Sequence, residues 1–206
     1  MITARHHIVI YPLFKWLTKY LLRRNFYEVV IDGDYIRQDN PLLVVSNHIS
    51  WWDGFWIMHL NLTLIRKRFH FMMLEESLRR HWYFRYAGGY SVQKKSKSIV
   101  ESIDYTVDLL RNTENMVFIF PQGRISSAYN DRIKFERGVE RILEKAPSNL
   151  DILLVANFVD YLSRSKPTLF TYIKQYRAAS LKEQSVEQVY AMFYENVLQR
   201  QKEKVS

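Results

Sequence analysis

The chain has no cysteine, and it has only six glycines and five prolines among its 206 residues. The absence of cysteine excludes disulfide bonds, a thiolate nucleophile and metal binding through sulfur. A transmembrane helix of about 20 apolar residues is also missing, because Pro12, Lys15 and Lys19 interrupt the most apolar stretch, residues 8–22. The glycine patterns of phosphate loops, dinucleotide-binding turns and nucleophile elbows do not occur, and no histidine has a metal-ligand spacing. We therefore expect no metal site and no bound cofactor.

Positive charge and aromatic side chains are what the chain has in excess. Thirty Lys and Arg residues against 21 Asp and Glu give a net charge of +9, and 15% of the residues are aromatic. Such a surface attracts anions, whether lipid head groups, nucleic acid or a phosphorylated molecule such as coenzyme A. Trp and Tyr favour membrane interfaces. No nucleic-acid-binding motif is present and the basic residues are scattered, so a basic nucleic-acid-binding domain is an alternative that we do not favour.

The order of the apolar segments predicts an α/β fold. Strands alternate with helices, which is typical of a single mixed, mostly parallel sheet flanked by helices, here with an N-terminal amphipathic helical segment. We expect residues 1–26 to form that segment and residues 27–206 to form one domain. Ser185 and Gln188 have the spacing of a capping box at the start of the last helix. Strands are expected at 28–36, 42–46, 69–74, 90–93, 116–120, 151–158 and 168–173, and helices at 51–60, 75–87, from 98, around 135–143 and after 185.

The N-terminal segment has the periodicity of an amphipathic helix. Residues 5–24 place apolar side chains at helical spacing, with Lys or Arg elsewhere, as in a helix that lies flat in a membrane interface. The same pattern fits a helix packed on the domain, because periodicity does not identify what covers the apolar face. Both alternatives are open at this point. The apolar face comprises Leu13, Phe14, Leu17, Tyr20 and Leu21.

A histidine and an aspartate follow the predicted strand 42–46. His48 lies two residues after the last residue of the strand, and Asp53 follows five residues later, near the expected start of a helix. Ligands of open α/β sheets bind beyond the carboxyl ends of the strands. An imidazole there, oriented by a carboxylate, is suited to act as a general base near neutral pH.

A second polar turn follows the predicted strand 116–120. Pro121 and Gly123 mark the end of the strand, and glycine lets the backbone approach a ligand closely. Arg124 carries a permanently charged fork that suits phosphate or carboxylate. The two turns together predict one site, with a base from the first turn and an anion clamp from the second.

Taken in order, these motifs resemble the signatures of the glycerolipid acyltransferases, the family typified by lysophosphatidic acid acyltransferase. His48 and Asp53 resemble the first signature, and residues 120–126 resemble the third, usually written F-P-E-G-T-R-S. Residues 88–94 lie where the family has its second signature, and residues 134–139 are similar to the helix start that follows the third. The order and the separations agree over about residues 28 to 160.

The resemblance implies an enzyme, an acyltransferase that moves a fatty acyl group from an acyl thioester to a hydroxyl or amine of a lipid acceptor. The donor is expected to be acyl-coenzyme A or acyl carrier protein, with His48 as general base and Asp53 as its partner. Backbone N–H groups near Gly123 or in the 47–50 turn are expected to stabilise the oxyanion. Substrate contacts are expected from Asn47, Ser50, Lys94, Gln122, Gly123 and Arg124.

The resemblance also implies a place for the chain in the cell. It points to lipid metabolism, specifically phospholipid biosynthesis, by a peripheral membrane protein on the cytoplasmic face of a membrane with anionic lipids. It favours a membrane contact for residues 1–26. It makes no prediction of an oligomeric state.

Several positions depart from the family pattern. Gln122 replaces the usual Glu, Arg124 lies one position earlier than the usual Arg, and Lys94 replaces an Arg of the second signature. An amide cannot supply negative charge, and a shifted or replaced guanidinium points its fork differently. We therefore expect an acceptor other than lysophosphatidic acid. The same departures motivate an alternative, a catalytically lapsed member that acts as a lipid-binding or adaptor module.

Overall fold

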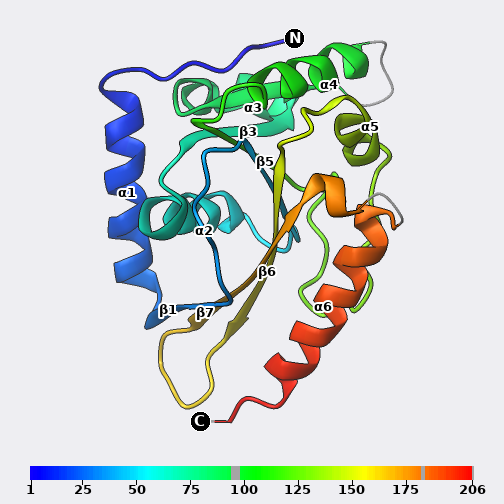
Figure 1. The fold of residues 1–206 in the computed structure, drawn as a ribbon. Coiled ribbons are helices and arrows are strands. Elements are labelled where there is room, and N and C mark those ends of the chain that lie inside the picture. The colour runs from blue at the N-terminus through cyan, green and yellow to red at the C-terminus, as the bar shows by residue number, and fades with distance from the viewer. Residues whose placement is uncertain (94–97, 182–183, 206) are drawn as a thin grey trace.

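The computed structural model describes residues 1–93, 98–181 and 184–205, and these residues form one sheet with helices on both faces (Figure 1). The seven strands follow the order β1-β7-β6-β2-β5-β3-β4. Only β6 and β7 pair antiparallel, and all other neighbours are parallel. The α/β prediction of a single mixed, mostly parallel sheet is confirmed. The strands are β1 (Glu28–Asp32), β2 (Leu42–Ser46), β3 (Arg68–Leu74), β4 (Gly89–Val92), β5 (Asn115–Ile119), β6 (Asp151–Asp160) and β7 (Thr168–Arg177).

Helices cover both faces because the central strands are apolar on both sides. Every residue of β2 and β5 is buried. Leu43 and Val45 face a core completed by α4, α5 and α6, whereas Leu42 and Val44 face a core completed by α1 and α2. Figure 1 accordingly shows α1 and α6 on opposite sides of the sheet. The helices are α1 (Ile10–Asn25), α2 (Asp53–Leu60), α3 (Glu75–Arg80), α4 (Ser98–Leu109), α5 (Gly138–Lys145) and α6 (Val186–Lys202).

The Ser185 capping box is present, but several predicted bounds are wrong. The Ser185 hydroxyl accepts the Gln188 N–H, and the Gln188 side chain accepts the Ser185 N–H, both at 3.2 Å. The strand predicted at 28–36 ends at Asp32, because Gly33 turns the chain with a φ of +116°. The helix predicted at 75–87 is two pieces, α3 and the 3₁₀ helix Trp82–Tyr86.

The N-terminal helix starts later than residue 5, because the first residues pair with the edge of the sheet. Ser91 of the edge strand β4 donates its N–H to Ile2, and Gly88 donates its N–H to Arg5. The Arg5 N–H in turn binds the Arg85 carbonyl at 2.9 Å. The segment therefore pairs with the chain just before β4 and satisfies one backbone group of this edge strand, the Ser91 N–H.

Helix α1 packs on the domain with one face and leaves the other face exposed. Phe14, Thr18 and Leu22 are buried. Leu13 and Tyr20, which belong to the apolar face identified from the periodicity, are exposed, at 55% and 43%. The domain covers only part of that face, because one side of the helix meets α2 and the 3₁₀ helix. Within the described residues, no helix is long and apolar enough to cross a bilayer.

Candidate active site

The two polar turns meet because their strands are parallel neighbours. The register pairs Val45 of β2 with Ile119 of β5, so both strands end at the same edge of the sheet. Strand β6 flanks β2 on its other side, with Ser46 opposite Val155. His48 and the 120–126 turn consequently lie side by side, as the sequence predicts.

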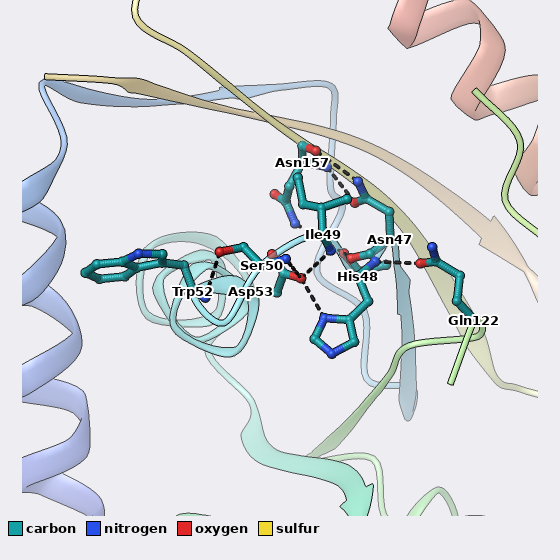
Figure 2. A network of polar contacts seen from close by, with 9 residues as sticks. Asn47, His48, Ile49, Ser50, Trp52, Asp53, Gln122 and Asn157 are labelled. Carbon is teal, nitrogen blue, oxygen red and sulfur yellow. Dashed lines mark hydrogen bonds and ion pairs between the residues drawn. The ribbon is translucent and has the colours of Figure 1, made fainter. Parts of the chain in front are cut away.

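His48 and Asp53 form a hydrogen-bonded pair (Figure 2). His48 Nδ1 lies 2.7 Å from Asp53 Oδ2, and the same oxygen accepts the N–H groups of Ile49 at 2.7 Å and Ser50 at 2.9 Å. Asp53 is fully buried at the first residue of α2, whereas the His48 side chain is 21% exposed. A carboxylate oxygen only accepts, so Nδ1 carries the proton and Nε2 keeps a free lone pair. This arrangement is that of a base held in one tautomer.

Burial sets the electrostatics of the pair. Loss of water raises the pKa of Asp53, and the hydrogen bonds from His48, Ser50 and Ile49 oppose that rise. Asp53 Oδ1 is buried without a hydrogen-bond partner among the described residues. A buried carboxylate with a spare acceptor gains most when the ring beside it becomes positively charged. Asp53 is therefore placed to stabilise an imidazolium.

Gln122 joins the two turns. Its Oε1 accepts the backbone N–H of His48 at 2.6 Å, and the His48 carbonyl accepts the Ser126 N–H at 2.8 Å. The imidazole also stacks on the Phe120 ring, with centroids 3.7 Å apart and planes 4° from parallel. Gln122 is only 7% exposed and does not line the pocket described below. We assign it to positioning His48, and its contact with substrate stays a prediction.

Asn47 and Ser50 also act within the protein. Asn47 is fully buried, and its side chain donates to the Asn157 carbonyl at 2.9 Å and accepts the Asn157 N–H at 2.8 Å. It therefore ties the end of β2 to β6 (Figure 2). The Ser50 hydroxyl accepts the Trp52 N–H at 3.2 Å at the start of α2. Neither residue lines the pocket, and both stabilise the scaffold of the site, so their contact with substrate stays a prediction.

Two of the predicted substrate-binding residues do face the pocket. Gly123 has a φ of +60° and donates its N–H to the Phe120 carbonyl at 3.1 Å, closing a tight turn. Arg124 follows it, is exposed, and lines the pocket beside His48. Arg124 forms no ion pair with another described residue. Lys94, the remaining predicted contact, lies outside the described residues.

The pocket runs from His48 into the apolar layer under α1 and has a volume of about 400 Å³. Trp51, Arg124 and Ile125 are exposed and border it. Side chains from α1, α2, β3, β5 and the 3₁₀ helix form its walls, and most of them are aromatic or aliphatic. The aromatic members are Phe14, His48, Trp51, Phe55, Phe69, Phe71, His81, Phe84, Phe118 and Phe120.

Four N–H groups in the regions where oxyanion donors are expected, the 47–50 turn and the residues near Gly123, already have acceptors within the protein. The N–H groups of His48, Ile49 and Ser50 bind Gln122 and Asp53, and the Gly123 N–H binds Phe120. A sequence does not reveal which acceptors in the protein bind the N–H groups of such turns. Oxyanion stabilisation by other N–H groups near Gly123 stays a prediction.

Sequence reasoning missed most of the pocket wall. Phe120, which stacks on His48, and the pair Phe69 and Phe71 were read only as parts of strands. The sequence signal that could have identified them is their spacing. Phe118 and Phe120 are two residues apart, as are Phe69 and Phe71, so each pair lies on one face of its strand. Trp51 and Phe55 also line the pocket.

No group of three or more His, Asp or Glu residues in the described part of the chain is arranged to hold a metal ion. The sequence model of the family described as "Acyltransferase" matches residues 28–161, well over half of the chain. No curated protein matches the sequence significantly. The matched span contains both polar turns and the strands that carry them.

Proposed function

Because the chain belongs to the acyltransferase family, we propose that it moves a fatty acyl group from an acyl thioester to a hydroxyl or amine of a lipid acceptor, with His48 as the general base. The observation that carries the proposal is the 2.7 Å contact between His48 Nδ1 and the buried Asp53, at the opening of an apolar pocket. His48 lines this pocket, and Nε2 is the ring nitrogen that the bond to Asp53 leaves available. An acyl chain in the pocket would place its thioester at the same opening.

The proposed reaction needs no nucleophile from the protein. Nε2 of His48 takes the proton of the acceptor hydroxyl or amine as its oxygen or nitrogen attacks the thioester carbon. Asp53 stabilises the imidazolium, as the aspartate of a Ser-His-Asp triad does. When the tetrahedral intermediate collapses, the carbon–sulfur bond breaks and the imidazolium returns its proton to the departing thiolate. An ester or amide and a free thiol result, and no metal or bound cofactor takes part in these steps.

The Arg124 turn is the proposed source of oxyanion stabilisation. The backbone N–H groups of Arg124 and Ile125 have no acceptor among the described residues, and both residues line the pocket. The Arg124 guanidinium adds a positive charge at the same edge. Donors already in place when negative charge develops are usually a large contribution to catalysis.

The donor and the acceptor are assigned by chemistry. An apolar pocket lined by aromatic rings suits a fatty acyl chain, and the proposed donors are acyl-coenzyme A and acyl carrier protein, with Lys94 as an expected contact. Arg124 remains the proposed clamp for an anionic group of the acceptor. The shifted position of Arg124 underlies our proposal that the preferred acceptor is not lysophosphatidic acid.

We propose that the enzyme acts at the cytoplasmic face of a membrane with anionic lipids and that it takes part in phospholipid biosynthesis. Helix α1 exposes Leu13, Trp16 and Tyr20, and Trp16 and Tyr20 are stacked with centroids 5.5 Å apart. Basic residues Lys19, Arg23 and Arg24 are exposed on the same helix. Aromatic rings flanked by lysine and arginine suit the interface of an anionic bilayer. Residues 1–26 therefore combine packing on the domain with a proposed membrane contact.

A competition assay tests the proposal. Purified protein is given an acyl-coenzyme A and a vesicle-borne pool of lysolipids, amino-acid lipids and glycolipids that includes lysophosphatidic acid, and products are identified by mass spectrometry. We expect an acylated lipid to form, with lysophosphatidic acid not the fastest acceptor. Binding of lipids without any product, with either donor, would favour the lapsed lipid-binding or adaptor alternative. If lysophosphatidic acid has the highest kcat/KM, the altered signature does not change the acceptor.

A further inference from the structure

A continuous series of aromatic rings surrounds the pocket. From His48, neighbouring ring centroids lead to Phe120 at 3.7 Å and from Phe120 to Phe118 at 4.5 Å. The series continues through Phe69, Phe71 and Phe84 with centroid separations of 6.0, 5.5 and 5.9 Å. It thus runs from the catalytic pair, along β5 and β3, to the 3₁₀ helix.

Phe14 of α1 closes this series. Its ring lies 5.8 Å from Phe84 on one side and 5.4 Å from Phe55 on the other, and Phe55 lies 5.1 Å from Trp51 at the pocket opening. Phe14 is 8% exposed, whereas Leu13 beside it is 55% exposed. Among the described residues, Phe14 is the only side chain of α1 that lines the pocket, and the exposed Leu13 lies next to it in the chain.

We propose that Phe14 sets the length of acyl chain that the pocket accepts. The inference rests on the proposed function, because it takes the pocket to hold the acyl group while His48 faces the thioester. In this proposal the chain enters at His48, runs between the rings towards α1, and stops where its terminal methyl meets Phe14. Close packing of the rings gives this wall little freedom to yield.

The proposed role of Phe14 predicts how affinity depends on the length of the acyl chain. Each methylene that enters an apolar pocket raises affinity by about fourfold. Affinity should rise with chain length until the terminal methyl reaches Phe14, and then stop rising. A smaller side chain at position 14 opens space behind the wall, so room for about two further methylenes raises the affinity for long chains by roughly tenfold or more.

Leu22 offers a matched control on the same helix. It is also buried, at 3% exposed, but it packs with Phe26, Trp56 and Leu169 and does not line the pocket. Leu22→Ala removes a large buried side chain from α1, as Phe14→Ala does. Any general loosening of α1 would therefore affect both variants, whereas a change of length preference is expected for Phe14 alone.

The experiment measures binding of hexanoate, decanoate and hexadecanoate by calorimetry, below their micelle concentrations, for the wild type and for Phe14→Ala, Phe14→Leu and Leu22→Ala. Phe14→Ala should raise the hexadecanoate-to-hexanoate affinity ratio by about tenfold or more, Phe14→Leu should raise it less, and Leu22→Ala should leave it unchanged. If Phe14→Ala does not fold, Phe14→Leu decides. An unchanged ratio in the folded Phe14 variants, or an equal change in Leu22→Ala, would overturn the inference.

Thiol release from acyl-coenzyme A is measured in parallel. If the affinity ratio shifts but no thiol is released, the result contradicts the proposed function and leaves the role of Phe14 standing.

Discussion

Gln122 Oε1 accepts the backbone N–H of His48 at 2.6 Å, and this bond fixes the turn that carries the imidazole. The resembled signature has Glu at this position, and a carboxylate oxygen can accept the same N–H. We expect Gln122→Glu to keep kcat within a few-fold of the wild type. Gln122→Leu should leave the His48 N–H without a partner, at a cost of about 1–3 kcal/mol in unfolding free energy, and should lower kcat. Denaturant unfolding and steady-state kinetics measure both effects, and a Gln122→Leu variant with wild-type stability and kcat would contradict the positioning role.

The buried carboxylate of Asp53 is expected to support turnover without stabilising the folded protein at neutral pH. Burial raises the pKa of Asp53 in the folded protein, so the folded state holds this proton more readily than the unfolded chain. Its contribution to stability is then present at low pH and is lost as pH rises through the folded pKa. We therefore expect Asp53→Asn to be at least as stable as the wild type at pH 7, while turnover falls by up to about 10⁴-fold, the loss seen for the equivalent change in a Ser-His-Asp triad. Thermal unfolding at pH 7 together with turnover tests this, and a clear loss of stability would contradict it.

His70 predicts the acid side of the stability profile. Burial lowers its pKa from 6.5 to about 3, with the neighbouring His6 adding to the shift. Between these two values the unfolded chain binds more protons, so stability falls as pH drops below about 6.5, by a few kcal/mol over the full window. His70→Gln can keep the bond to Asn115 and cannot titrate. Between pH 7 and pH 5, the unfolding free energy of His70→Gln should change less than that of the wild type. His7→Gln, which alters an exposed histidine, is the control and should behave like the wild type. An equal change of unfolding free energy with pH in all three proteins would contradict this prediction.

Membrane contact by α1 is tested with surface substitutions. Deleting residues 1–24 would also remove Phe14 and Leu22 from the core and residues 2–7 from the sheet edge. Replacing Lys19, Arg23 and Arg24 with Gln should weaken binding to anionic vesicles by about 10²-fold, at about 1 kcal/mol for each basic residue.

Trp16→Ala should weaken vesicle binding as well. Met192→Ala is the control, because Met192 is similarly exposed, at 54%, but lies on α6 across the sheet. Co-sedimentation at physiological salt measures the binding. Equal binding by the wild type and by both α1 variants would show that this helix is not the contact.

The sequence predicted the parts of the fold and site that depend on local order. Strand 42–46 is apolar throughout, so its end and the position of His48 were identifiable, and Asp53 lies one turn away at a helix start. The aromatic pocket was not predictable in the same way. Phe14, Phe69 and Phe84 come from three elements far apart in the sequence, and only the strand order brings their rings together. The pairing of residues 2–7 with residues 85–91 was missed for the same reason, since the contacts of this segment are known only once the strand order is known.

The most direct measurement is the rate of acyl transfer by His48→Ala, with Asp53 and the rest of the pocket intact. Purified wild type and variant are compared for thiol release from an acyl-coenzyme A and for the acylated lipid formed, after circular dichroism and thermal unfolding show that both are folded. If His48 is the general base, kcat/KM falls by about 10²–10⁴-fold while binding of free fatty acid is unchanged. A folded His48→Ala protein that transfers the acyl group at the wild-type rate would contradict the proposed chemistry.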